Sequence, residues 1–163
     1  MAQLDYGYGI PAGIAGGIYG LENYDIVARL NDEATGTMKF GVGVVQGANA
    51  GKSVKRPVAD STAAQFEGVV VYNANRELTY EGANNLRKGT PLSIMNYGKV
   101  WVRTGANAKV TYGADAYLIT SGDEVGCFTT TADEATKVAI KGRFITEVTD
   151  GLAVVELFNS KNA

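Results

Sequence analysis

The residues of this chain that could do chemistry begin with a glycine-rich segment, residues 47–53, which reads GANAGKS. A phosphate-binding P-loop has four residues between its first glycine and the Gly-Lys-Ser triplet, and the loop must open a helix that helps hold the phosphate. Here three residues intervene, Gln46 stands where that first glycine belongs, and residues 54–58 have the composition of a strand. We therefore interpret residues 47–53 as a turn.

Carboxylates are the next candidates, and they occur as three adjacent pairs: Asp32 with Glu33, Asp123 with Glu124, and Asp133 with Glu134. Glycosidases need two carboxylates on separate elements that face each other across a cleft. Neighbouring residues in polar turns do not meet that requirement, and none of the pairs fits a calcium-binding loop. We expect solvated loop charges at all three places.

Nucleophilic catalysis would rest on Cys127, the one cysteine, because the chain contains no histidine. Histidine is the usual base that activates a serine or cysteine and the commonest metal ligand. Cys127 shares a face with Val125 and Thr129, which indicates a small buried apolar residue. We expect no enzyme activity, no cofactor and no metal.

A basic and aromatic stripe lies on one face of residues 98–103, where Lys99, Trp101 and Arg103 alternate with Val100 and Val102. Such a stripe can stack on single-stranded nucleic acid, anchor a protein interface, or cover the indole within the chain. The net charge of -2 argues against binding nucleic acid through overall charge. The interface and packing interpretations both remain open.

The elements that must position these residues are strands. Among 163 residues there are 21 glycines and 3 prolines, as expected for short strands joined by tight turns. Alternating apolar residues predict strands, and Asp150-Gly151 between two of them predicts a type I′ hairpin. The pattern becomes that of strands from about residue 24, and the expected strands span residues 38–44, 66–72, 98–103, 115–120, 125–130, 137–148 and 152–158. Residues 83–88 could add one helical turn.

This pattern predicts an all-β fold, a compact antiparallel sandwich or barrel that is jelly-roll-like or β-tulip-like. We expect a single β domain over residues 23–163. No apolar run is long enough to span a bilayer, and the first residues lack the features of a signal peptide, so we expect a protein that is used without secretion.

Residues 1–22 form a separate glycine- and tyrosine-rich segment, which we expect to be an extended N-terminal arm. Its glycines disfavour a helix, and its Tyr and Ile side chains disfavour a freely solvated tail. The arm should therefore lie on another surface, either its own domain or a neighbouring subunit.

The order of these segments resembles the structural cement proteins of tailed bacteriophages. The resemblance is carried by short motifs that together cover residues 24–158. They are YDIVARLN (24–31), FGVGVVQG (40–47), FEGVVV (66–71), RKG (87–89), GKVWV (98–102), YGADAY (112–117), GRFIT (142–146) and AVVEL (153–157).

The resemblance implies a capsid decoration protein on the outer surface of a phage head, made in the cytoplasm of the bacterial host. The implied partners are the major capsid protein and copies of the chain itself, with a trimer favoured over a dimer, and neither nucleic acid nor a membrane. It transfers no catalytic residues. The alternatives are another virion β-module, such as a tail-tube or head-fibre base protein, and an enzyme or carbohydrate-binding module.

The predicted contacts with the capsid or a neighbouring subunit lie in the arm, with the basic and aromatic stripe as a second patch. Apolar and tyrosine side chains suit a surface that is buried on assembly. The candidates are Tyr6, Tyr8, Ile10, Ile14, Ile18 and Tyr19 in the arm, and Trp101 and Arg103 in the stripe.

Overall fold

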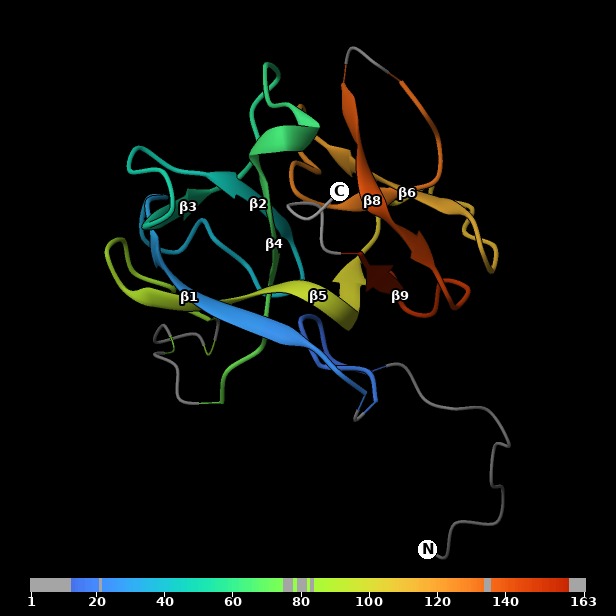
Figure 1. Cartoon of the computed structure of the whole chain (residues 1–163), viewed down its shortest axis with the longest axis horizontal. Helices are drawn as coiled ribbons and strands as arrows, with labels where there is room; N and C mark the ends of the chain where they lie inside the picture. The colour runs from blue at the N-terminus through green and yellow to red at the C-terminus, as the bar shows by residue number, and fades with distance from the viewer. Residues whose placement is uncertain are drawn as a thin grey trace, which may run out of the picture.

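The computed structural model describes residues 13–20, 22–74, 78, 82, 84–133 and 136–158. Within these ranges the chain forms nine strands and one short 3-10 helix, which confirms the all-β prediction (Figure 1). In chain order the elements are β1 (Asp25–Asn31), β2 (Gly43–Gln46), β3 (Ser53–Lys55), η1 (Ala63–Gln65), β4 (Phe66–Val70), β5 (Pro91–Arg103), β6 (Asp115–Ile119), β7 (Phe128–Thr129), β8 (Lys137–Phe144) and β9 (Leu152–Leu157).

Five strands close into a first ring, on the left of Figure 1. β1 runs antiparallel to β5 and pairs in parallel with β3 at Leu30 and Asn31. β2 joins β3 to β4, and β4 pairs back onto β5 at Val69 and Val70. Closure depends on the β1–β3 contact, the one parallel pairing between the named strands of the described chain.

The remaining strands form a second ring that shares β5 with the first. β9 pairs with β5 over residues 98–103, and β8, β6 and β7 follow in order. A bridge between Thr104 and Phe128 returns β7 to the end of β5. The 13-residue strand β5 therefore belongs to both rings.

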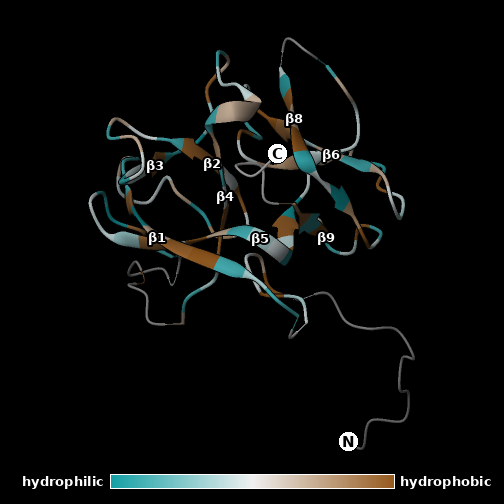
Figure 2. Ribbon diagram, in the orientation of Figure 1, coloured by the Kyte–Doolittle hydropathy of each residue, from teal (hydrophilic) through white to brown (hydrophobic). Residues whose placement is uncertain are grey.

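The buried apolar side chains form two clusters, the larger of which joins Val45, Phe66 and Val69 of the first ring to the core of the second. In Figure 2 parts of the β1 and β2 ribbons are coloured brown, for hydrophobic residues. The larger cluster includes the fully buried rings of Phe128 and Phe144, and the smaller includes Ile94 and Met38. A buried side chain of this size contributes about 1.5–3 kcal/mol. These clusters hold β5 in place, and β5 in turn positions the stripe residues.

The predicted strand over residues 38–44 is wrong for its first five residues. β2 begins at Gly43, because Gly41 adopts a φ of 75° and turns the chain. The Gly41 N–H donates to the Val70 carbonyl (2.9 Å), and the Gly41 carbonyl accepts from the Arg103 N–H (2.8 Å). Met38 and Phe40 are buried as the alternation predicted, although they lie in a loop.

The Asp150-Gly151 hairpin is confirmed. Both residues have positive φ, 53° and 72°, as a type I′ turn requires. Thr149 and Leu152 exchange two backbone hydrogen bonds across it. β8 ends at Phe144 rather than near residue 148, because the Thr146 hydroxyl accepts the hydrogen bond of the Val154 N–H.

The sequence analysis missed the short helix η1, which precedes β4. The side chain of Gln65 accepts a hydrogen bond from the Thr62 N–H (3.0 Å), the reach-back contact of a capping box. The Thr62-Ala63-Ala64-Gln65 spacing is the signal that could have found it. In the described part of residues 83–88 no helical turn forms, and no helix in the described ranges has the length and apolar composition to span a bilayer.

Candidate interaction surface

Residues 13–20 lie along β5 as an additional strand-like segment. The Trp101 N–H donates to the Gly17 carbonyl, and the Tyr19 N–H donates to the Lys99 carbonyl, both at 2.9 Å. The Gly16 N–H donates to the Trp101 carbonyl at 2.7 Å. This part of the predicted arm therefore packs on its own domain. Tyr6, Tyr8 and Ile10 lie outside the described residues.

Glycines make this close approach possible. Gly16 has a φ of 81°, and a Cβ placed on it would lie 2.6 Å from the carbonyl oxygen of Val70. A Cβ on Gly13 would overlap the indole of Trp101. Any larger residue at either position would push residues 13–20 away from β5.

Trp101 is covered by this segment, with 8% of its surface exposed. The ring of Tyr19 meets the indole edge-on, with centroids 5.8 Å apart. Of the interpretations left open for the stripe, the structure thus shows packing of the indole within the chain. Little indole surface is left for stacking on a base. A role for Trp101 as an interface anchor stays a prediction.

Lys99 and Arg103, at the two ends of the stripe, are partly exposed. The Lys99 ammonium donates to the Glu22 carboxylate at 2.7 Å, and this hydrogen bond raises the pKa of Lys99. Arg103 donates through Nε to the Phe40 carbonyl at 2.9 Å. That bond orients the guanidinium and leaves its terminal nitrogens available to a partner.

Two of the predicted contact residues point away from the domain on the docked segment. Ile14 is 54% exposed and Ile18 is 39% exposed, whereas Tyr19 is half-buried. Further exposed aromatic residues, which the sequence analysis did not single out, are Tyr24, Tyr97, Tyr112 and Phe158. Tyr97 and Phe158 line the same shallow hollow, and no sequence signal separates them from buried aromatics.

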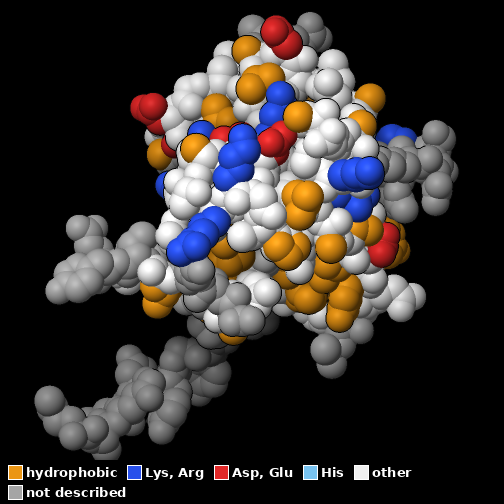
Figure 3. Space-filling view, turned by 90° about the vertical axis from the view of Figure 1, so that its left-hand side faces the viewer, with side chains coloured by type: hydrophobic (Ala, Val, Ile, Leu, Met, Phe, Trp, Pro, Cys, Tyr) orange, Lys and Arg blue, Asp and Glu red, His pale blue; other side chains and the backbone are white. Residues whose placement is uncertain are grey.

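The side of the molecule that carries β1 and β3 has mixed character (Figure 3). Lysine and arginine side chains alternate there with acidic and hydrophobic ones, and hydrophobic side chains gather toward the lower part of the view. Leu30 and Val58 are each nearly half exposed. A surface of this kind suits a protein partner better than a polyanion.

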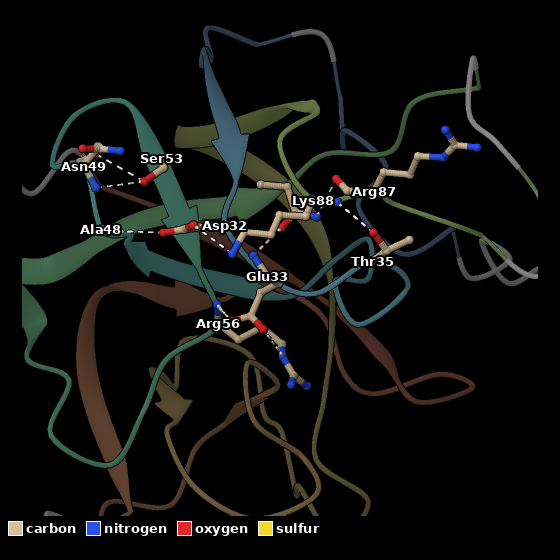
Figure 4. A network of polar contacts seen from close by, with 10 residues as sticks. Asp32, Glu33, Thr35, Ala48, Asn49, Ser53, Arg56, Arg87 and Lys88 are labelled. Atoms are coloured by element: carbon tan, nitrogen blue, oxygen red, sulfur yellow. Dashed lines mark hydrogen bonds and ion pairs between the residues drawn. The ribbon is translucent and has the colours of Figure 1, made fainter.

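The P-loop-like segment is the β2–β3 connection, as the turn interpretation predicts. The Ser53 hydroxyl accepts from the Asn49 N–H at 3.1 Å, and Ser53 begins a strand, not a helix. Asp32 accepts from the Ala48 N–H at 2.8 Å, with Lys88 Nζ 3.6 Å from its other oxygen (Figure 4). The loop is thus closed by side chains and offers no phosphate cradle.

Three of the paired acidic residues accept hydrogen bonds from loop backbone, whereas solvated charges were predicted. The Ala48 hydrogen bond, followed by the charge of Lys88, lowers the pKa of Asp32. Glu33 accepts from the Arg56 N–H at 2.9 Å, and Glu124 accepts from the Ala106 N–H at 2.7 Å. Among the described residues no group of three acidic or cysteine side chains could hold a metal.

Cys127 is half-buried and not in a disulfide. Burial, followed by the charge of Glu124, raises the pKa of its thiol. A thiol held in its neutral form is a poor nucleophile.

Comparison with known proteins gives a match to a family model and matches to solved structures. The family model described as "Structural cement protein (E217 gp24/Pam3 gp6)" matches residues 2–158. A chain in the solved structure described as "The capsid of Myoviridae Phage XM1" has a similar fold, with a TM-score of 0.74 and 16% identity, covering 93% of this chain and 94% of that one. At this identity the likeness shows the fold. No curated protein matches the chain in sequence.

Proposed function

We propose, from the premise that this chain belongs to the structural cement protein family of bacteriophages, that it binds the outer surface of a tailed-phage head between major capsid subunits. Its role is that of a capsid cement or decoration protein. By binding the expanded shell and not its broken forms, it stabilises the expanded shell through mass action. We also propose that it acts without catalysis, nucleic acid or membrane, and is made in the host cytoplasm.

The observation that carries this proposal is the exposed pair Ile14 and Ile18 on a segment held to β5 by backbone hydrogen bonds. Apolar side chains on an already ordered backbone lose little conformational freedom when a partner covers them. The twelve residues that precede Gly13 then contribute the remaining predicted contacts, Tyr6, Tyr8 and Ile10.

The primary experiment is co-sedimentation with expanded shells that lack the protein, scored beside the heat resistance of those shells. We expect saturable binding and higher heat resistance. Rings or tubes formed by the protein alone, without binding to shells, would move the assignment to a tail component.

The contribution of the arm is tested with two variants. One deletes residues 2–12 and keeps the docked segment, and the other carries Ile14→Ser and Ile18→Ser. We expect both to reduce occupancy on shells, whereas Tyr112→Ser, which alters an exposed residue outside the docked segment, should not. Undiminished occupancy of both arm variants would contradict the arm as a contact.

We further propose that copies of the chain associate on the shell, as a trimer in preference to a dimer. Repeated contacts over many copies allow modest interfaces to act together. Light scattering of the free protein and occupancy counts on shells test this. A monomer in both conditions would refute it.

A further inference from the structure

Two adjoining hollows form a groove at the C-terminal end of β5. They share Arg103, Asp150 and Leu152 and have volumes of about 280 and 410 Å³. The smaller continues to Lys39, Thr104 and Cys127, and the larger to Ile14, Phe40 and Tyr72. We call this surface the Arg103 groove. It connects the docked N-terminal segment with the second ring.

A buried polar atom in this groove lacks a partner. Thr104 is 9% exposed, and its hydroxyl oxygen is buried without a hydrogen bond in the described chain. Buried polar groups in native proteins are almost always satisfied, so an unsatisfied one that lines a hollow indicates a missing partner. The hydroxyl can both donate and accept.

The smaller hollow is lined by three cations, of which Arg56 is paired with Glu33. Neither Lys39 nor Arg103 forms an ion pair with a described residue, and Arg103 is held in orientation through its Nε bond to Phe40. Both cations lie close enough to Cys127 to act on its pKa. Asp123 and Asp150 also line the smaller hollow.

This arrangement selects one kind of occupant. The two cations provide a site for a carboxylate, which an oriented guanidinium can bind through two parallel hydrogen bonds. The two cations balance a single carboxylate, whereas a chain of phosphates would also lie against the two aspartates, so nucleic acid is disfavoured. Hollows of this size can each hold one or two side chains of an extended segment. A whole helix, about 10–12 Å across, would not fit into them.

We propose that the Arg103 groove docks an extended, carboxylate-bearing segment of the shell subunit, with the carboxylate at Arg103 and Lys39 and an apolar side chain at Ile14, Phe40 and Tyr72. This inference rests on the proposed function and specifies the partner chemistry at Arg103.

The first test is charge reversal at the rim. Lys39→Glu changes an exposed lysine, and Lys109→Glu is the matched control on an exposed lysine outside the groove. We expect Lys39→Glu to weaken binding to shells about tenfold or more and to flatten its salt dependence, with Lys109→Glu unchanged. Arg103→Lys, which keeps the charge but loses the fork, should weaken binding less than Arg103→Glu.

The second test measures how accessible the groove is, through the rate at which its native thiol, Cys127, is labelled. A maleimide labels Cys127 in the free protein, and we expect labelling to slow about tenfold or more on shells. The Cys127→Ser variant gives the background. Protection that grows with protein concentration in the absence of shells would assign the groove to a second copy and overturn the proposal.

The two proposals fail in different ways. If the unaltered protein does not bind shells, the proposed function fails. If it binds, but Lys39→Glu binds as tightly and Cys127 labels equally on and off the shell, the groove proposal fails and the cement role stands.

Discussion

The two rings share a strand but are held together by different interactions. The second ring encloses apolar side chains, among them Phe128, Phe144 and Leu118, all essentially inaccessible. The first ring mixes apolar residues with buried polar ones. Asn31 donates to the carbonyls of Leu86 and Arg87, and Arg29 Nε lies 3.6 Å from the carboxylate of Glu67, whose side chain is 2% exposed.

This difference indicates that the two kinds of contact have different roles, one in stabilising the fold and the other in fixing the positions of its strands and loops. Apolar burial stabilises in proportion to area and tolerates variation in shape. Buried polar contacts add little net stability but penalise any arrangement that leaves them unpaired. We infer that the second ring supplies most of the folding free energy, and that the polar contacts of the first fix how β1 and its loops are placed.

The largest effect should come from opening the apolar core of the second ring. Phe144→Ala should lower the free energy of unfolding by about 3–5 kcal/mol, because it removes a fully buried ring and leaves a cavity. Tyr112→Ala, at a residue 73% exposed, is the control and should change it by less than about 0.5 kcal/mol. Denaturant unfolding measures both, and equal losses would invalidate the comparison.

A smaller effect is expected from the ion pair of the first ring. Glu67→Gln keeps the shape but removes the charge opposite Arg29, which is partly exposed and can turn to water. We expect a loss of about 1–2 kcal/mol, with faster amide exchange confined to β1 and β4. Glu147→Gln on the surface serves as control. Exchange that accelerates equally in β8 and β9 would show that the rings are not energetically distinct.

The free-energy cost of replacing a turn glycine should be the same in both rings. Gly151 has a φ of 72° and Gly51 a φ of 74°, and a Cβ at either would meet no atom within 4 Å. Gly151→Ala and Gly51→Ala should each cost about 1–2 kcal/mol, because only the left-handed backbone is penalised. Thermal or denaturant unfolding tests this. A much larger cost at Gly151 would mean that the substitution also disrupts contacts of the second ring beyond the turn.

The smallest effect concerns Asp32 and pH. Its pKa is lowered in the folded protein, so its stabilising contribution is present above the ordinary value of 3.8 and is lost as pH falls through the lowered value. Hydrogen exchange at Ala48 should therefore accelerate as pH falls below 3.8, after correction for intrinsic exchange. Asp32→Asn should remove that dependence, and a dependence that persists would locate its origin elsewhere.

Sequence reasoning succeeded where a local pattern decides the structure. The Asp150-Gly151 turn and the alternation of β8 depend on residues a few positions apart, and both were found. Residues 38–42 were placed in a strand because their burial alternates, but the positive φ of Gly41 converts them into a loop.

Local sequence patterns did not predict the long-range contacts of the fold. Nothing local indicates that β1 pairs with both β3 and β5, or that Gly13 and Tyr19 cover Trp101. The same limit applies to the candidate surface. Ile14 and Ile18 were named as contact candidates from their apolar character, but their exposure follows from which side of the segment meets β5.

Residues 16–19 pair antiparallel with β5, and this pairing has a mechanical consequence. A pull on the chain at Gly13 directed along β5 loads the bonds of Gly16, Gly17 and Tyr19 side by side, so they must rupture together. A pull perpendicular to β5 would break them one after another at lower force. The segment is therefore a tether whose strength depends on direction, and because β5 runs through both rings, tension along it is shared by the whole fold.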